Sequence, residues 1–404
     1  MKQSHKNVAV MKSILVVGSV LGVCSPLWAT FKPKSMAYFY KIYSIGSAVF
    51  WILVTIWMIY AKQKYLSDSI ISPVRFMDCA VHICLAVFSV SVILVSGYVH
   101  SDRLKTLFKH LDLLDERLTH DVMKSRRKIY YHFGTFNVFL LAFMISDATI
   151  WISTLGLKWY SKYYLTRVIQ LYQCFLTVFF ANVLADQLRD RFETLNQLLV
   201  NTIKGSDCGF WVYSQQFNVR LNNRRGVKEF SQIHTFLCEM VENFNSIFGF
   251  LFMFAALVSI VMILNFVVMM LAIFFFEIKI EGIEYGTNLL VVCTMGIVII
   301  IVQTVILAWI GERLSNEASK THRISYSILN SISLLPYIET KEGLRDDLLL
   351  LSMQSVFRKP CVRASGFFVV NYRMLGFMTA TLTSYVIVAV QFLTQTPPKL
   401  KELY

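Results

Sequence analysis

Residues 246 to 276 read SIFGFLFMFAALVSIVMILNFVVMMLAIFFF, a run of 31 positions without a charged side chain. At a rise of about 1.5 Å per residue, a helix of this length exceeds the roughly 30 Å hydrocarbon core of a bilayer. Six further apolar stretches of membrane-spanning length occur along the chain. The seven stretches lie at about 42 to 60, 76 to 99, 129 to 157, 168 to 185, 246 to 276, 287 to 310 and 365 to 392. They predict an all-α, polytopic membrane protein with seven transmembrane helices.

The composition supports the same class. Hydrophobic residues make up 56% of the 404 positions and charged residues only 16%, with a mean hydropathy of +0.55. A soluble domain carries about 25% charged residues, so this chain has too little polar surface for that class. The net charge of +14 falls in segments that flank the apolar stretches. We therefore expect contact with membrane lipid and no nucleic-acid partner.

The Lys and Arg residues are unevenly distributed between the two sides of the stretches. The segments before the first, third, fifth and seventh stretches hold 6, 8, 7 and 8 of the 39 basic residues, whereas the alternate connections and the C-terminal segment hold 3, 3, 1 and 2. Arg373, inside the last stretch, completes the 39. Because basic residues are retained on the cytoplasmic side, this bias predicts a cytoplasmic N-terminus. An odd number of crossings then places the C-terminus outside. A G-protein-coupled receptor has the reverse orientation.

The N-terminal segment, residues 1 to 41, contains a shorter apolar run. Residues 11 to 24 (MKSILVVGSVLGVC) follow Lys2 and Lys6 and resemble the core of a signal peptide. Cleavage there would require an extracellular N-terminus and would contradict the charge distribution. We interpret the run as a short helix at the cytoplasmic interface. At the other end, residues 393 to 404 are expected to form an extracellular tail.

The connections on the basic side are long and have helical periodicity. Leu104, Leu107, Leu111, Leu114 and Leu118 are spaced by three and four residues, the pattern of an amphipathic helix with one apolar face. Similar stripes continue the fourth stretch and precede the fifth. Helical extensions are therefore expected to pack together as a cytoplasmic anchor bundle. They lie at 100 to 128, 186 to 245 and 311 to 364.

Several familiar motifs are missing from the sequence. It contains no P-loop, HExxH, GxSxG or CxxC pattern, so neither an enzyme nor a bound cofactor is predicted. The eight cysteines are scattered, without the spacing of a zinc site or a disulfide framework. The sequence also lacks an internal repeat, which argues weakly against a secondary transporter.

The last apolar stretch carries polar residues on one helical face. Ser384, Val388 and Gln391 are spaced by four and three residues, so their side chains lie along one stripe. An amide near the end of an apolar helix costs free energy unless it meets water or another polar group. Copies of Gln391 around a central axis would satisfy that need. A hydrogen bond from Gln391 to a neighbouring helix of the same subunit would satisfy it too.

The ending of this stretch resembles that of insect gustatory receptors. In that family the last helix carries Thr-Tyr, five apolar residues and Gln-Phe; here Ser384 and Tyr385 are followed by five apolar residues, Gln391 and Phe392. The length, the seven stretches and the run at Leu21 to Pro26 fit the family as well. The resemblance implies a ligand-gated cation channel, a homotetramer or a heteromer with related receptors, whose channel domain spans residues 42 to 392. It also implies pore residues, namely Ser384, Tyr385, Val388, Gln391 and Phe392.

The same resemblance implies a pocket for a small-molecule tastant in the outer half, among the second to sixth stretches. Asp147 is the most conspicuous residue at that depth, because a carboxylate in the membrane costs about 3 kcal/mol unless it is paired or hydrated. Trp151 follows one turn later on the same face. A structural hydrogen bond from Asp147 to Gln170 or His82 is the alternative interpretation. The candidate ligand-binding residues are Asp147, Trp151, His82, Gln170, Tyr172, Gln173, Asn265 and Asn288.

These observations predict a taste receptor that acts as a tastant-gated, non-selective cation channel. An odorant-receptor type of channel from the same superfamily is the closest alternative. A seven-helix G-protein-coupled receptor and a secondary transporter are the other two classes considered.

Overall fold

The computed structural model describes residues 7–8, 11–23, 34–66, 72–99, 101–118, 122–157, 160–161, 164–207, 223–276, 285–333 and 341–395. Nearly all of them are helical. The elements are α2 (Lys12–Val20), α3 (Lys34–Leu66), α4 (Ser72–Leu94), the π-helical turn η1 (Val95–Val99), α5 (Ser101–Leu118), α6 (Val122–Leu155), α8 (Leu165–Asp207), α9 (Asn223–Phe276), α10 (Tyr285–Ser333), α11 (Lys341–Phe357), β1 (Arg363–Ala364), β2 (Phe368–Val369) and α12 (Tyr372–Gln395).

Within the described residues, seven helices are long and apolar enough to cross a membrane. These spans lie in α3, α4, α6, α8, α9, α10 and α12, one for each apolar stretch of the sequence. The all-α fold with seven candidate transmembrane helices is thus confirmed. Of the expected terminal segments, residues 1 to 6, 9 to 10, 24 to 33 and 396 to 404 lie outside the described part of the chain.

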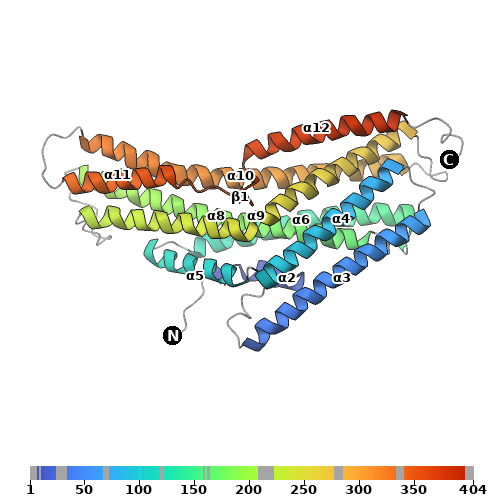
Figure 1. Cartoon of the computed structure of the whole chain (residues 1–404), viewed down its shortest axis with the longest axis horizontal. Helices are drawn as coiled ribbons and strands as arrows, with labels where there is room; N and C mark the ends of the chain where they lie inside the picture. Colours follow the sequence, from blue (N-terminus) through green and yellow to red (C-terminus); the bar gives the residue numbers. More distant parts are fainter. Residues whose placement is uncertain are drawn as a thin grey trace.

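Three helices are much longer than a bilayer is thick. α8, α9 and α10 contain 43, 54 and 49 residues, so α9 alone is about 80 Å long at 1.5 Å per residue. Their far ends lie beside α11 at one end of an elongated molecule, while α12, α3 and α4 lie towards the other (Figure 1). We call the packed ends of α8, α9 and α10 with α11 the bundle. Its apolar contacts come from Leu199, Val227, Ile328, Leu348 and Leu351.

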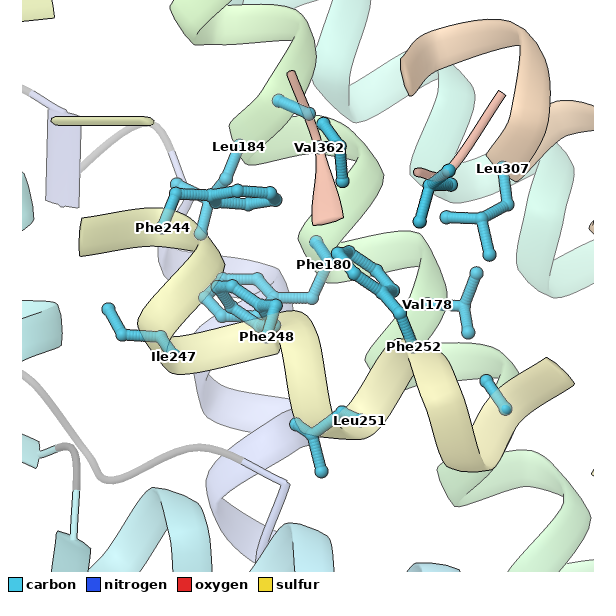
Figure 2. Packing of buried hydrophobic residues seen from close by; sticks show 14 of the residues in the cluster. Val178, Phe180, Leu184, Phe244, Ile247, Phe248, Leu251, Phe252, Leu307 and Val362 are labelled. Carbon is cyan, nitrogen blue, oxygen red and sulfur yellow. The ribbon is translucent and has the colours of Figure 1, made fainter. Parts of the chain in front are cut away.

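The main core lies where α8 and α9 cross in the middle of the molecule. Phe244 and Phe248 of α9 are one helical turn apart, with ring centroids separated by 4.9 Å. Phe180 of α8 meets the Phe248 ring edge-on at 5.8 Å (Figure 2). All three rings are at most 3% exposed. Aromatic packing of this kind fixes the long helices at their midpoints.

The first part of the seventh apolar stretch is not helical. Residues 363 to 369 form a short antiparallel hairpin, in which Arg363 pairs with Val369 and Ala364 with Phe368. Its turn requires left-handed backbone at Ser365 (φ 48°) and Gly366 (φ 82°). Glycine adopts that conformation without steric cost. The helix that follows the hairpin, α12, begins only at Tyr372.

The short N-terminal helix is packed against the protein. In α2, Ile14 and Leu15 are 2% and 1% exposed and belong to the main core. The helix contacts α8, and Gln173 Nε2 donates a 2.8 Å hydrogen bond to the Leu21 carbonyl directly after it. The apolar run at 11 to 24 therefore contributes a packed helix.

Candidate functional site

A cluster of charged side chains joins α3, α4 and α8 at the end of the membrane-spanning region away from the bundle. Lys62 Nζ of α3 lies 2.7 Å from Asp78 Oδ2 of α4, and Arg167 Nη1 of α8 lies 3.7 Å from Asp78 Oδ1. His82 Nε2 is 2.9 Å from Lys62 Nζ and 3.6 Å from Asp78 Oδ2. Such charges are tolerated in an apolar region because each faces an opposite charge or a hydrogen-bonding group.

Aromatic rings cover one side of these charges. Trp151 of α6 stacks on Tyr164 with ring centroids 4.4 Å apart and an interplanar angle of 19°. Tyr160 stacks in turn on Tyr164 at 6.3 Å, and Lys62 Nζ lies 4.5 Å from the centre of the Tyr164 ring. Burial, reinforced by the nearby Asp147 carboxylate, raises the pKa of Tyr160 to about 12. A tyrosine hydroxyl is neutral at physiological pH even with its ordinary pKa near 10, and this shift moves its ionisation further from that pH.

Asp147 lies beside the aromatic rings and is hydrogen-bonded to one of them. The Trp151 indole Nε1 donates a hydrogen bond of 3.2 Å to Asp147 Oδ1, one turn earlier in α6. Neither of the partners expected from the sequence forms that bond. His82 faces Lys62 instead, and Gln170 Nε2 donates to Thr55 Oγ1 at 3.2 Å. We call Lys62, Asp78, His82, Asp147, Trp151, Tyr164 and Arg167 the polar-aromatic cluster.

The other candidate ligand residues are more dispersed. Tyr172 donates through its hydroxyl to Asn137 Oδ1 at 2.7 Å, which ties α8 to α6. Gln173 faces Leu21 near α2. Asn265 of α9 is only 3% exposed, whereas Asn288 at the start of α10 is exposed. The structure thus brings His82, Asp147 and Trp151 into one cluster and leaves Gln173 outside it.

Four residues of the cluster are missing from the sequence-based set, namely Lys62, Asp78, Tyr164 and Arg167. Lys62, Tyr164 and Arg167 fall in the connections between apolar stretches, so they were assigned to loops. In the structure Lys62 and Arg167 lie on the terminal turns of α3 and α8 and point back towards Asp78. The available signal was Asp78 itself, because a carboxylate inside an apolar stretch requires a nearby cation.

The last helix, α12, packs along one side against α9 and α10 and leaves most of its surface uncovered within the subunit. Only 6% of its most apolar 18-residue window is buried, compared with 78% for α8 and 67% for α9. Tyr385, Val388 and Phe392 are 55%, 43% and 63% exposed, and Ser384 and Gln391 are exposed as well. A helix of this composition is left open to further protein, lipid or water along most of its circumference.

The polar side chains of α12 differ in how they are satisfied. Ser384 Oγ donates to the Ala380 carbonyl at 3.1 Å within the helix, and Thr379, Thr381 and Thr383 bond in the same way. Among the described residues, none forms a side-chain hydrogen bond with the Gln391 amide. The alternative of a bond from Gln391 to a neighbouring helix is therefore not seen in the described part of the subunit.

The chain matches the 7tm Chemosensory receptor family over residues 11–395. It is also similar to the solved insect olfactory receptor OR5 from Machilis hrabei in complex with eugenol, with a TM-score of 0.61 and 12% identity over 95% of this chain and 99% of that one. A second OR5 structure gives a TM-score of 0.56 and 14% identity over 86% and 89%. No curated protein sequence matches the chain.

The family match covers almost the whole described region, and the fold agreement extends over the full length of the olfactory receptor. Together with the seven candidate membrane spans, these findings identify a multi-pass receptor of the plasma membrane and not an enzyme. The chain belongs to the 7tm chemosensory receptor family.

Proposed function

We propose that this protein is a taste receptor that acts as a tastant-gated, non-selective cation channel, with a cytoplasmic N-terminus and an α12 from each of four subunits around a central pore. The observation that carries the proposal is the exposure of α12. Only 6% of the residues in its most apolar window are buried within the subunit, and Gln391 is exposed. Association around a four-fold axis would place this helix between protein and a water-filled path.

Each residue on the exposed stripe then has a defined role. Gln391 forms the constriction, and Val388 and Ser384 follow it further along the pore. Tyr385 and Phe392 pack behind the lining. A ring of neutral amides offers dipoles but no net charge, so it discriminates weakly among small cations.

The ligand is proposed to bind at the polar-aromatic cluster. Its cations, Lys62 and Arg167, are matched by two carboxylates, Asp78 and Asp147, so the cluster presents little net charge. A neutral molecule with hydroxyl groups or an aromatic ring suits such a lining, because the stacked rings offer apolar area and the charged groups offer hydrogen bonds. Bitter compounds, sugars and internal nutrients each include molecules of this kind, so all three stay open as ligands.

An odorant-receptor type of channel is the second candidate. The fold shared with the olfactory receptor from Machilis hrabei favours it. The ending of α12 favours the taste receptor, because Ser384, Tyr385, Gln391 and Phe392 follow the gustatory pattern. Both candidates use the same pore and differ in the ligand.

The direct test is to record currents from cells that express the full-length protein, alone and with related receptors, against panels of tastants and volatile odorants. We expect a tastant to evoke a cation current. Gln391→Arg should suppress that current while the variant still reaches the cell surface. Currents evoked only by volatile odorants would favour the second candidate. If Gln391→Arg reaches the surface and leaves an evoked current of normal amplitude, the assignment of α12 to the pore is wrong.

A further inference from the structure

A cavity lies in the half of the membrane-spanning region next to the bundle, between α6, α8 and α10. Its volume is about 660 Å³, within the usual range for ligand sites of roughly 300 to 1,000 Å³. It opens at the surface, because Phe139, Val302 and Ile306 in its lining are 58%, 44% and 43% exposed. We call this cavity the bundle-side groove. It is separate from the polar-aromatic cluster, with which it shares no residue.

The groove has the length of one leaflet. Along α6 its lining extends from Lys128 to Leu140, twelve steps of a helix or about 18 Å. Half of a bilayer core measures about 15 Å. The sides are mainly Phe, Ile, Val and Leu, whereas the charged lining residues lie only at the end towards the bundle. An occupant that fits must therefore be apolar over one leaflet and polar at its surface.

Two buried polar residues near that end have hydrogen-bonding capacity to spare. Gln187 is 2% exposed and Asn182 is 6% exposed, and both line the groove. Among the described residues, no partner is found for the Gln187 Nε2 and Oε1 atoms or for Asn182 Oδ1. Unmade hydrogen bonds of buried amides each cost about 1 to 3 kcal/mol. A ligand with ester or hydroxyl oxygens would satisfy them.

The charges at the groove's end favour an anion. Arg313 of α10 is half-buried, stacks over Trp309 at 4.5 Å and has no carboxylate within ion-pair distance in the described structure. Lys128 lies across the groove, with its Nζ 3.0 Å from Asp186 Oδ2. Because Arg189 Nη1 also binds Asp186, at 2.7 Å, that carboxylate is shared between two cations. Asp186 is thus already paired with two other cations, and the Arg313 guanidinium can bind a phosphate group.

We propose that the bundle-side groove binds an anionic glycerophospholipid. One acyl chain lies between α6 and α10, the Gln187 amide donates to an ester carbonyl, and Arg313, assisted by Lys128, holds the phosphate. Trp309 is placed at the depth where indole rings prefer the interface. In the proposed orientation this is the cytoplasmic leaflet, where anionic lipids are concentrated. The lipid would join α6, which packs loosely, to α8 and α10.

The test uses the purified full-length protein and phosphatidylserine with a diazirine in one acyl chain. After irradiation, we expect the cross-linked peptides to map to the groove faces of α6 and α10, with unlabelled phosphatidylserine a better competitor than phosphatidylcholine. Arg313→Gln should weaken capture on the order of fivefold, the effect of one basic residue near an anionic surface. Ile306→Trp, which fills the groove, should abolish capture in α6.

Matched variants separate a built site from general attraction. Arg127→Gln removes an exposed cation at the same depth, and Val305→Trp adds the same bulk to an exposed position of α10 outside the lining; both should leave capture intact. Equal losses for Arg127→Gln and Arg313→Gln, or capture unchanged in folded Ile306→Trp, would overturn the proposal. Competition by tastants but not by phosphatidylserine would instead assign the groove to a receptor ligand. Because no current is measured, failure of the channel proposal would leave this result unaffected.

Discussion

Trp151 is the residue on which both halves of the polar-aromatic cluster converge. Its indole nitrogen donates to Asp147, and its ring stacks on Tyr164, which also contacts Lys62 and Tyr160. A ligand that enters here would have to pack on these rings or replace one of their contacts. Side chains that hold one another in place in this way offer a preorganised surface.

Trp151→Ala and Asp147→Asn are each expected to shift the agonist dose response several-fold. The first change removes a stacked aromatic pair, worth about 0.5 to 1.5 kcal/mol beyond its buried area; the second removes a carboxylate and keeps its shape. The measurement is calcium influx as a function of agonist concentration at matched surface expression. Trp57→Ala, at a ring that is 52% exposed on α3, serves as the control. Unchanged sensitivity in both variants would make Asp147 and Trp151 structural residues.

Asp78 has a different role, because it is the counter-charge for two cations. Asp78→Asn leaves Lys62 and Arg167 without their carboxylate, and breaking a buried pair costs about 3 to 5 kcal/mol. We expect a clear fall in the thermal midpoint of the purified protein, followed by fluorescence-detected size exclusion. Lys320→Gln breaks an ion pair whose Lys side chain is 56% exposed and should change the midpoint little. Equal changes in the two thermal midpoints would show that the ion pairs of Asp78 stabilise the protein no more than a surface ion pair does.

At the scale of elements, the hairpin between α11 and α12 depends on close contacts with two long helices. A Cβ on Gly249 of α9 would meet the Arg363 carbonyl oxygen at 2.9 Å, and a Cβ on Gly311 of α10 would collide with the carbonyl of Val370. Both glycines are internal to helices, where the residue is ordinarily unfavourable. Because these two glycines have no side chain, the segment before α12 lies directly against α9 and α10. This contact sets the position at which α12 begins.

Gly311→Ala is therefore expected to destabilise the protein by about 1 to 3 kcal/mol, the usual cost of an overpacked contact. Gly46→Ala is the matched control, because a Cβ there meets nothing within 4 Å and alanine favours a helix. The two thermal midpoints should move in opposite directions. If the thermal midpoint of Gly311→Ala equals or exceeds that of the wild type, the contact between Gly311 and the Val370 carbonyl does not require glycine.

The sequence predicts the membrane spans, but it predicts neither the hairpin before α12 nor every residue of the candidate site. Uninterrupted apolar runs of membrane-spanning length are typical of transmembrane helices, so the spans in α3, α4, α6, α8, α9, α10 and α12 follow from the hydropathy of the sequence. The hairpin at 363 to 369 could not be predicted, because strands of two residues have no periodicity and the positive φ at Ser365 is uncommon for a non-glycine residue. In the candidate site, Asp147 and Trp151 were found from intramembrane polarity. The sequence does not reveal Lys62 and Arg167 as site residues, because the polar last turn of a membrane helix has the same composition as the loop beside it.

At the scale of the whole molecule, the orientation in the membrane remains a prediction from the 29 to 9 distribution of basic residues. An epitope tag after Tyr404 should be stained on intact cells, and one before Met1 only after permeabilisation, because the positively charged segments are retained inside. Untagged cells and a permeabilised sample provide the controls. The reverse staining pattern would remove the proposed channel orientation and revive that of a G-protein-coupled receptor.

The central claim, that four copies of α12 line a cation pore, is tested most directly by the reversal potential of Gln391→Glu. The substitution keeps the side chain's size and adds up to four carboxylates at the proposed constriction, which should favour divalent cations. Reversal potentials of agonist-evoked currents would be measured under opposed calcium and sodium gradients, with the wild type in parallel. We expect a higher calcium-to-sodium permeability ratio in the Gln391→Glu channels that reach the surface. Normal surface expression with an unaltered ratio would take Gln391 out of the pore.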